Sequence, residues 1–391
     1  MHKYLKIKYL FIFLLLIWPP LQVFILKIDG AGRITGILGL LTFLLYLKYN
    51  SFVKSIIMPP YSYWGILIIY SCLNAIAIGN LEALPAYSYF FLIFNPLLLM
   101  YLVNSNYSYE RDTLQNIIIL ALYLHLILLL VFSGKYQDGR LGIELDANYM
   151  ALSAAFLVFF LILKKAYNEL TNFRLIIYLV LPVIVVFLSG SRTGFGALTI
   201  LISGFLFSRR SKSSLKNLLY IILIAIMVYF IYDFISTKTY LGERLEMTQN
   251  QIQSDNSTMR TNTFLDNFGD RGIFYYLGFD LFKESPIFGI GFNNFKIKSG
   301  INTVLHTEYM RQLVEFGIIG FILFARFYYW IGSRLIRIWK KMADHRKITE
   351  IYLSGFIAFL FLNLWIFSGG FAVYFSFFAV TIPYILSYTK N

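Results

Sequence analysis

The stretch NIIILALYLHLILLLVFS, Asn116 to Ser133, decides the fold class of this chain. It holds no Asp, Glu, Lys or Arg over a length close to the roughly twenty residues that cross a bilayer's hydrocarbon core as a helix. Runs of this kind fill most of the 391 residues, of which 58% are hydrophobic and only 14% are charged. The mean hydropathy of +0.67 lies far outside the range of soluble globular proteins. The sequence therefore predicts an all-α polytopic membrane protein.

About twelve transmembrane helices are predicted, and residues 1–391 are expected to form a single integral membrane domain. The predicted spans are Tyr9 to Leu26, Ile34 to Leu47, Ser62 to Gly79, Tyr87 to Asn104, Asn116 to Ser133, Asn148 to Leu163, Leu175 to Leu188, Gly194 to Phe207, Leu218 to Ile235, Val314 to Gly332, Ile351 to Phe367 and Phe371 to Tyr388.

Basic residues collect in alternate loops between the predicted spans. The loops that carry them read KYNSFVK, KKAYNELTNFR, SRRSKSSLK and SRLIRIWKKMADHRK. Because cytoplasmic loops of membrane proteins are enriched in Lys and Arg, these loops and both termini are predicted to be cytoplasmic. The same alternation places residues 236–313 on the opposite, outer side as one large loop. Loops longer than about fifteen residues usually carry function or structure of their own, so short amphipathic helices are expected within it.

The formal net charge of +14 does not indicate a nucleic-acid partner. Most Lys and Arg lie in the short loops assigned to the cytoplasm, where topology and anionic lipid headgroups account for them. Membrane lipids are expected partners and nucleic acid is not. The single cysteine, Cys72, lies within a predicted span, so the chain offers neither a disulfide framework nor a thiolate metal site.

Arg192 stands in the segment LSGSRTGFG, Leu188 to Gly196, which is predicted to turn the chain between two spans on the outer side. A guanidinium group is always charged and pairs well with phosphate oxygens. Near hydrocarbon without a partner it costs several kcal/mol, so an anion is expected to meet it. The alternative is an interfacial arginine that reaches lipid headgroups.

A second arginine begins the segment RGIFYYLGFDLFKESPIFGIGFNNF, Arg271 to Phe295. Its apolar residues recur at helical spacing until Pro286, which predicts an amphipathic helix on the membrane's outer face. Arg271 then lies in the first turn, where the helix dipole favours an anion, although a solvated surface arginine is the alternative. The GIGFNN sequence lacks the third glycine and the preceding strand of a dinucleotide-binding motif, so its glycines are expected to turn the chain.

The segment LHTEYMRQLVEFGIIG, Leu305 to Gly320, places His306 just before a span on the same predicted side as both arginines. Glu308, Arg311 and Glu315 follow at one-turn spacing. A titratable imidazole near anion-binding arginines is typical of a transferase site, whereas a lone histidine can also be structural. No metal is expected, because no second His or carboxylate stands at ligand spacing from His306, and no cofactor is expected either.

These three segments and RLGIELDANYMA, Arg140 to Ala151, resemble the O-antigen ligase and O-antigen polymerase superfamily of bacterial inner membranes. They occur in the expected order over roughly the C-terminal two-thirds of the chain. The sequence departs from the family at Thr307, where the family often has asparagine after the histidine.

The resemblance implies transfer of a glycan from undecaprenyl diphosphate to a hydroxyl acceptor, at an active site that faces the periplasm. Arg192 and Arg271 are then expected to stabilise the diphosphate leaving group, and His306 to activate the acceptor hydroxyl as general base. The expected substrate-binding residues are Arg140, Asn148, Glu308, Arg311, Tyr275 and Tyr276. Direct, metal-independent displacement with inversion is expected. A chain-length regulator and a flippase are possible partners.

The acceptor separates two functions within this superfamily. A polymerase transfers the growing chain to the next lipid-linked repeat unit, whereas a ligase transfers the finished chain to lipid A-core. The aromatic outer segment, with Tyr275, Tyr276, Phe292 and Phe295 able to stack on sugars, favours the polymerase. Capsule or exopolysaccharide polymerisation would use the same chemistry. A polysaccharide transporter has a similar composition, but transporters place ionisable groups near the membrane midplane, and the predicted spans hold few.

Overall fold

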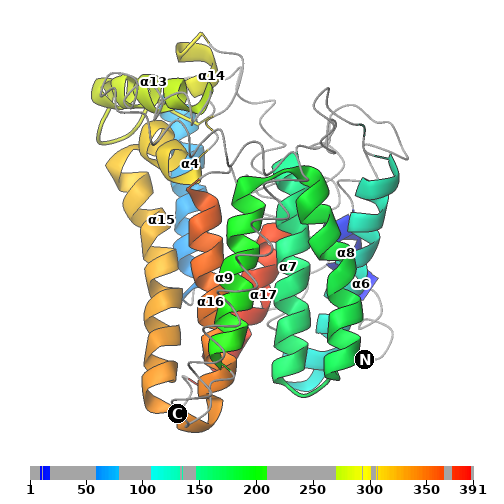
Figure 1. The fold of residues 1–391 in the computed structure, drawn as a ribbon. Helices are drawn as coiled ribbons and strands as arrows, with labels where there is room; N and C mark the ends of the chain where they lie inside the picture. Colours follow the sequence, from blue (N-terminus) through cyan, green and yellow to red (C-terminus); the bar gives the residue numbers. More distant parts are fainter. Residues whose placement is uncertain are drawn as a thin grey trace, which may run out of the picture. The chain divides into compact units, whose positions relative to one another are not determined.

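The computed structural model describes the chain in several stretches, and every regular element within them is a helix. These stretches are residues 9–10, 12–17, 59–78, 107–132, 134, 147–208, 270–292, 294–300, 305, 307–364 and 372–388. No strand occurs among these residues. The predicted all-α class is therefore confirmed for the described part of the chain (Figure 1).

The helices run in chain order from α4 to α17. They are α4 (Tyr61–Ala77), α6 (Tyr107–Phe132), α7 (Ala147–Ala166), α8 (Asn172–Ser189), α9 (Arg192–Ser208), α13 (Asp270–Glu284), α14 (Phe295–Lys298), α15 (Glu308–Lys341), the 3-10 turn η3 (Ala343–His345), α16 (Arg346–Asn363) and α17 (Ala372–Ser387).

Within these stretches, four helices are long and apolar enough to cross a membrane. They are the segments Glu110–Phe132, Asn148–Ala166, Asn172–Ser189 and Glu308–Lys341, and shorter apolar helices occupy Tyr61–Ala77, Arg192–Ser208 and Phe375–Ser387. Each of these helices, and α16, coincides with a predicted span. The predicted spans at 34–47, 87–104 and 218–235, most of the span at 9–26 and the first part of the predicted outer loop lie outside the described residues.

The chain divides into two compact units. The first unit comprises residues 1–124, 274–336 and 363–391, and the second comprises residues 125–273 and 337–362. Each unit has its own packed helices.

In the second unit, α7 is the central helix and packs against both α8 and α9 (Figure 1). In the most apolar 18-residue stretch of α7, 89% of the residues are buried, whereas in the corresponding stretch of α8 only 28% are buried. On α8, Phe173 is 73% exposed and Ile176 is 64% exposed. A helix that is apolar all round but exposed on one side suits contact with lipid on that side.

Small residues let α9 approach its neighbours closely. A Cβ atom at Gly194 would collide with the side chain of Ala151 on α7. A Cβ atom at Gly204 would collide with the side chain of Ser354 on α16. Such contacts between small residues are a common basis of helix association in membranes, because lipid offers no hydrophobic drive for it. The position of the start of α9 is thus fixed by close packing.

Aromatic side chains form the centre of the first unit, between α4, α15 and α17. The ring of Trp64 lies 5.1 Å from that of Phe327 and 5.0 Å from that of Phe375, measured between centroids. The ring of Phe378 lies 5.2 Å from that of Phe327. The tilted and edge-on geometries are the favourable ones for aromatic pairs. This cluster joins three helices that are far apart in the sequence.

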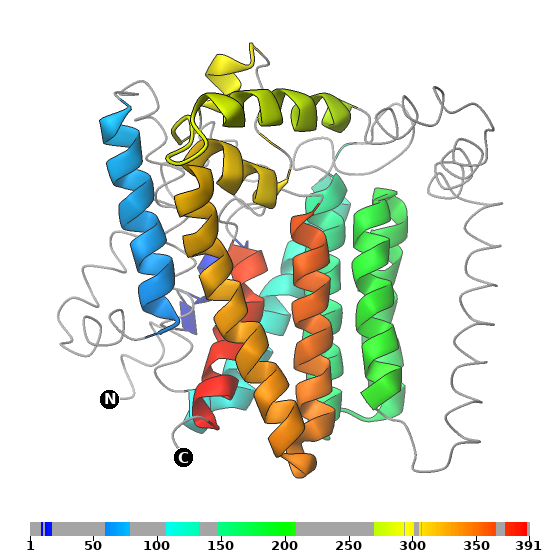
Figure 2. The same cartoon turned by 90° about the vertical axis from the view of Figure 1, so that its left-hand side faces the viewer.

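Helix α13 lies across the start of α15, as Figure 2 shows. Leu281 of α13 packs with Leu305, Met310 and Val314 in one buried cluster. Gly278 makes close approach possible, because a Cβ atom there would lie 3.2 Å from the terminal methyl group of Met310. The helix predicted to start at Arg271 and stop before Pro286 is thus confirmed, and its contacts attach it to the start of α15.

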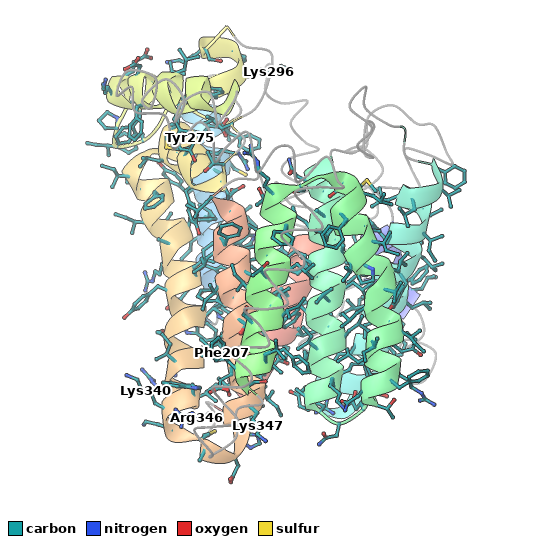
Figure 3. The ribbon with its side chains drawn as sticks, in the orientation of Figure 1. Phe207, Tyr275, Lys296, Lys340, Arg346 and Lys347 are labelled. Atoms are coloured by element: carbon teal, nitrogen blue, oxygen red, sulfur yellow. The ribbon has the colours of Figure 1, made fainter. Side chains whose placement is uncertain are left out.

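At the far end of α15, basic side chains gather where the chain turns into α16. Figure 3 shows Lys340, Arg346 and Lys347 in this region. The indole Nε1 of Trp339 donates a hydrogen bond to Glu350 Oε1 at 3.1 Å, and the guanidinium of Arg346 lies 4.6 Å from the Trp339 ring centroid. This corner corresponds to one of the basic loops found in the sequence.

Candidate functional site

The turn between α8 and α9 carries Arg192. Helix α8 ends at Gly190, which has a left-handed conformation with φ 59° and donates its N–H to Phe187 O at 3.1 Å. Glycine adopts this conformation without the steric cost that other residues meet, which is why it often ends helices. The next residue, Ser191, accepts a hydrogen bond from Gly194 N at 3.1 Å and so caps α9. Arg192 is therefore the first residue of α9.

Asn148, at the start of α7, takes part in this turn. Ser191 Oγ donates a hydrogen bond to Asn148 Oδ1 at 2.7 Å, across 43 positions of sequence. Ser189 Oγ in turn accepts from Ser191 N at 3.3 Å. Asn148 is predicted to bind substrate, and its side-chain oxygen is hydrogen-bonded to the residue that precedes Arg192.

The electrostatics of this turn favour an anion. Arg192 is half-buried at the N-terminus of α9, where backbone N–H groups and the helix dipole already contribute positive potential. A phosphate or carboxylate at a helix N-terminus is a common arrangement for the same reason. The α8–α9 turn thus has the charge that a diphosphate group requires.

On α13, the predicted residues occupy one helix. Arg271 is the second residue of α13, as predicted, and its side chain lies outside the described residues, as does that of Tyr276. Tyr275 is partly buried, and its hydroxyl donates a hydrogen bond to Leu364 O at 3.2 Å. Figure 3 shows Tyr275 on this helix. Its hydroxyl therefore has a backbone partner at Leu364. Phe292 and Phe295, which were also expected to stack on sugars, are buried in the packing of the protein.

Helix α15 is broken near its start. At Gly317 the backbone has φ 67° and ψ −169°, a conformation essentially restricted to glycine. The helix therefore consists of a short first part, Glu308 to Phe316, and a long second part from Ile318 (Figure 2). The residues just before the break are those that the sequence singled out.

The segment Pro286 to Gly291, called the crossing segment below, forms backbone hydrogen bonds with the residues on both sides of the break in α15. Ile318 N donates to Pro286 O at 2.9 Å, and Gly291 N donates to Glu315 O at 2.9 Å. Ile290 N donates to Val314 O at 2.9 Å. A break in an apolar helix is stable only if the freed backbone groups find partners. The two GIGFNN glycines, Gly289 and Gly291, thus turn the chain, as expected, and both adopt positive φ in doing so.

Side chains of α4 support the same break. Tyr70 Oη lies 2.8 Å from Phe316 O and 3.2 Å from Phe288 O. Asn74 Nδ2 donates to Phe288 O at 2.7 Å. Helix α4 therefore fixes both the crossing segment and the last residue before Gly317.

A buried polar cluster lines the first part of α15. Arg311 Nε donates to Glu315 Oε2 at 3.1 Å, and its terminal nitrogen lies 3.5 Å from Glu308 Oε1. The guanidinium carbon of Arg311 is 5.3 Å from the Phe292 ring centroid. All three charged side chains are at most 5% exposed. Burying charges is costly even when they are paired, so such a cluster points to a function beyond stability.

Gln312 completes this cluster. Its Nε2 donates to Glu308 Oε1 at 2.8 Å, while its Oε1 is buried and has no hydrogen-bond partner. A buried acceptor without a donor costs about 1–3 kcal/mol. The polar cluster, Glu308, Arg311, Gln312 and Glu315, therefore ends in one unsatisfied acceptor.

Two predicted site residues, His306 and Arg140, lie outside the described residues. Sequence reasoning missed Ser191 and Gln312 as site residues. Ser191 carries a readable signal, because serine just before a helix is a preferred N-cap. The sequence gives no such signal for Gln312, because only the structure shows that its Nε2 is hydrogen-bonded while its Oε1 has no partner. Among the residues that the structure describes, no group of three His, Cys, Asp or Glu side chains could hold a metal ion.

Comparisons with known proteins identify the same segments. A family model described as O-antigen ligase matches residues 177–325. The matched range is less than half of the chain, and it includes the α8–α9 turn, α13, the crossing segment and the break in α15. A comparison with curated proteins gave no match. The resemblance predicted from the sequence is confirmed: this helical membrane protein is similar, over residues 177–325, to the O-antigen ligase and polymerase superfamily of glycosyltransferase-like enzymes.

Proposed function

We propose that this protein is a surface-polysaccharide polymerase of the O-antigen type. It transfers the growing glycan from undecaprenyl diphosphate to a hydroxyl of the next lipid-linked repeat unit. The family match over residues 177–325 carries the proposal, because it contains Arg192, Arg271 and His306 in the order found in the sequence. The reaction takes place at the periplasmic face of the bacterial inner membrane, with both termini in the cytoplasm.

The arginines act on the leaving group. When the bond between the anomeric carbon and the phosphate oxygen breaks, negative charge develops on the lipid diphosphate. Fixed cations in a site of low dielectric stabilise that charge strongly. Arg192 supplies one, supported by the N-terminus of α9, and Arg271 supplies the other from the first turn of α13. Arg140 is a third candidate.

His306 acts on the acceptor. It removes the proton from the acceptor hydroxyl as that oxygen forms its bond to the anomeric carbon, and undecaprenyl diphosphate leaves from the opposite face. This single displacement inverts the anomeric centre and uses no metal. Isolation of a covalent glycosyl-enzyme, or a strict requirement for a divalent cation, would contradict it.

A ligase is the second candidate, because the matching family model carries that description. A ligase would use the same donor and leaving group but lipid A-core as acceptor. The aromatic residues of α13, Tyr275 and Tyr276, favour the polymerase, since stacking faces suit successive sugars of a growing chain.

A lipopolysaccharide gel separates the two candidates. A strain that lacks this gene is compared with strains that carry the intact copy or the His306→Ala variant. Core capped with a single repeat unit and no ladder identifies the polymerase. Bare core, with polymer accumulating on undecaprenyl diphosphate, identifies the ligase.

The His306→Ala variant also tests the chemistry. Loss of a general base typically reduces the rate by about 100- to 10,000-fold. The matched control is His345→Ala in η3, at the basic corner, which should restore the ladder like the intact copy. A full ladder from His306→Ala would remove His306 from the mechanism.

A further inference from the structure

Gln312 has a buried oxygen without a partner. The side chain is 4% exposed, and its Oε1 makes no hydrogen bond. The orientation of the amide is fixed by its other end, because Nε2 donates to Glu308 Oε1 at 2.8 Å. A flipped amide would place two acceptor oxygens against each other. The atom without a partner is therefore an acceptor.

Among the described residues, Asn74 Oδ1 of α4 is also buried without a hydrogen-bond partner, but Gln312 is the one that lies on the helix after His306. The large majority of buried polar side-chain atoms have at least one hydrogen-bond partner. The exceptions call for an explanation, and a bound ligand that brings the missing donor is one. The working state of the enzyme is then expected to supply an O–H or N–H group to Gln312 Oε1.

The neighbours of this oxygen define the chemistry of its partner. Glu308 presents a carboxylate on the same helix face, one turn earlier. Arg311 already contacts Glu315 Oε2 at 3.1 Å and Glu308 Oε1 at 3.5 Å. Two adjacent acceptor side chains suit hydroxyl groups, each of which donates one hydrogen bond. An ionised phosphate only accepts, so this part of the cluster does not suit the diphosphate.

We propose that Gln312 recognises the acceptor glycan: its Oε1 accepts a hydrogen bond from a sugar hydroxyl beside Glu308. The inference rests on the proposed function. It assigns Gln312 to the acceptor rather than the donor because α15, which carries Gln312, begins two residues after His306, the proposed base that must reach the acceptor hydroxyl. Gln312 is thus a specificity-determining residue for the sugar that receives the chain.

Transfer kinetics of the full-length protein in nanodiscs test this assignment. Radiolabelled lipid-linked polymer is the donor at fixed concentration, and the unlabelled lipid-linked single repeat unit is the varied acceptor. If the wild type transfers glycan only to lipid A-core, lipid A-core is used as the varied acceptor in place of the lipid-linked repeat unit. Gln312→Met keeps the size of the side chain and removes the oxygen. We expect the KM for the acceptor to rise about 10-fold, as for loss of one hydrogen bond to a buried group, with the KM for the donor unchanged.

Two further variants keep the test decisive. Gln312→Asn keeps the amide and withdraws its oxygen by one methylene, so we expect a smaller rise in the acceptor KM. Gln115→Met makes the same substitution at a buried glutamine of α6 and should leave both KM values unchanged. Thermal unfolding is measured for each variant, because a structural role of Gln312 would lower its unfolding temperature.

The outcomes separate the inference from the proposed function. An acceptor-specific rise in KM at the wild-type unfolding temperature supports it. An unchanged acceptor KM assigns the oxygen to a bound water and overturns it. A loss that affects donor and acceptor alike, with a lower unfolding temperature, also overturns it. If the wild type transfers glycan to neither acceptor, the proposed function itself fails.

Discussion

The starts of α9 and α15 are built differently, although both carry predicted site residues. At α9 a glycine and two serines form a turn held by neutral hydrogen bonds, and Arg192 is the first helical residue. At α15 three charged side chains and Gln312 are buried on one face, and the helix breaks at Gly317. The first region presents positive potential at a helix end. The second pairs two carboxylates with one guanidinium and leaves one neutral amide oxygen without a hydrogen-bond partner.

This difference suits the two tasks of the proposed glycosyl transfer. A diphosphate leaving group needs fixed cations, which suits the α8–α9 turn. A sugar hydroxyl needs an acceptor and a base, which suits the polar cluster after His306. Variants in the two regions should therefore affect different measured properties of the protein. Charge changes at α15 should alter stability first, and charge changes at α9 should alter catalysis first.

Arg311→Met should have the largest effect on stability. It leaves Glu308 and Glu315 buried without the cation that pairs them, and breaking a buried ion pair typically costs about 3–5 kcal/mol. Thermal unfolding in detergent measures the loss. The control is Lys298→Met, which removes the exposed pair of Lys298 with Glu284 at 3.1 Å. Exposed pairs contribute about 0–1 kcal/mol, so equal unfolding temperatures for both variants would refute the role of burial.

Arg192→Ala should reduce transfer by about 10- to 150-fold, because a lost charge-assisted hydrogen bond to the diphosphate costs about 1.5–3 kcal/mol. The unfolding temperature should stay close to that of the wild type. Arg192→Lys should recover part of the rate, since lysine keeps the charge but not the planar fork. Arg174→Ala, at the exposed start of α8, serves as control and should transfer at the wild-type rate. If Arg192→Ala lowered the unfolding temperature but not the transfer rate, Arg192 would serve stability and not catalysis, against the contrast drawn between α9 and α15.

Gly317→Ala should destabilise the break in α15. A Cβ atom at Gly317 would collide with Ile287 O, and the conformation itself is restricted to glycine. We expect a loss of about 2–3 kcal/mol in unfolding free energy. Gly300→Ala is a matched control, because Gly300 also has positive φ, at 69°, but nothing lies within 4 Å of the added atom. It should cost about 1 kcal/mol, and an equal loss in both variants would show that the collision does not matter.

The sequence predicts the helices well because length and apolar composition specify a membrane span almost alone. The predicted span Asn148 to Leu163 lies within α7, and the span Leu175 to Leu188 lies within α8. The helix after Asp270 and its end before Pro286 were equally readable, from helical spacing and from proline chemistry. One-turn spacing also predicted that Glu308, Arg311 and Glu315 lie on one face.

The break in α15 was not predictable. Gly317 stands in an apolar run, and glycine is common in membrane helices without breaking them. The break is stabilised by hydrogen bonds that Ile318 N and Ile319 N donate to Pro286 O and Ile287 O, about thirty residues earlier in the chain. The contact between Ser191 and Asn148 is hidden for the same reason, since no local pattern pairs residues 43 positions apart. Local chemistry thus predicted the elements, and hydrogen bonds between residues far apart in the sequence determine the geometry around the candidate site residues.

Ser191→Ala should have the smallest effect, and it tests whether the neutral turn positions Arg192. The variant loses the cap on Gly194 N and the hydrogen bond to Asn148 Oδ1. Loss of a serine cap typically costs about 1 kcal/mol, so we expect a slightly lower unfolding temperature. If the cap also positions Arg192, transfer should fall about 5-fold at saturating donor, and Ser191→Thr, which keeps the hydroxyl, should recover most of the rate. A wild-type rate in Ser191→Ala would mean that close packing of α9 against α7 positions Arg192 without the cap.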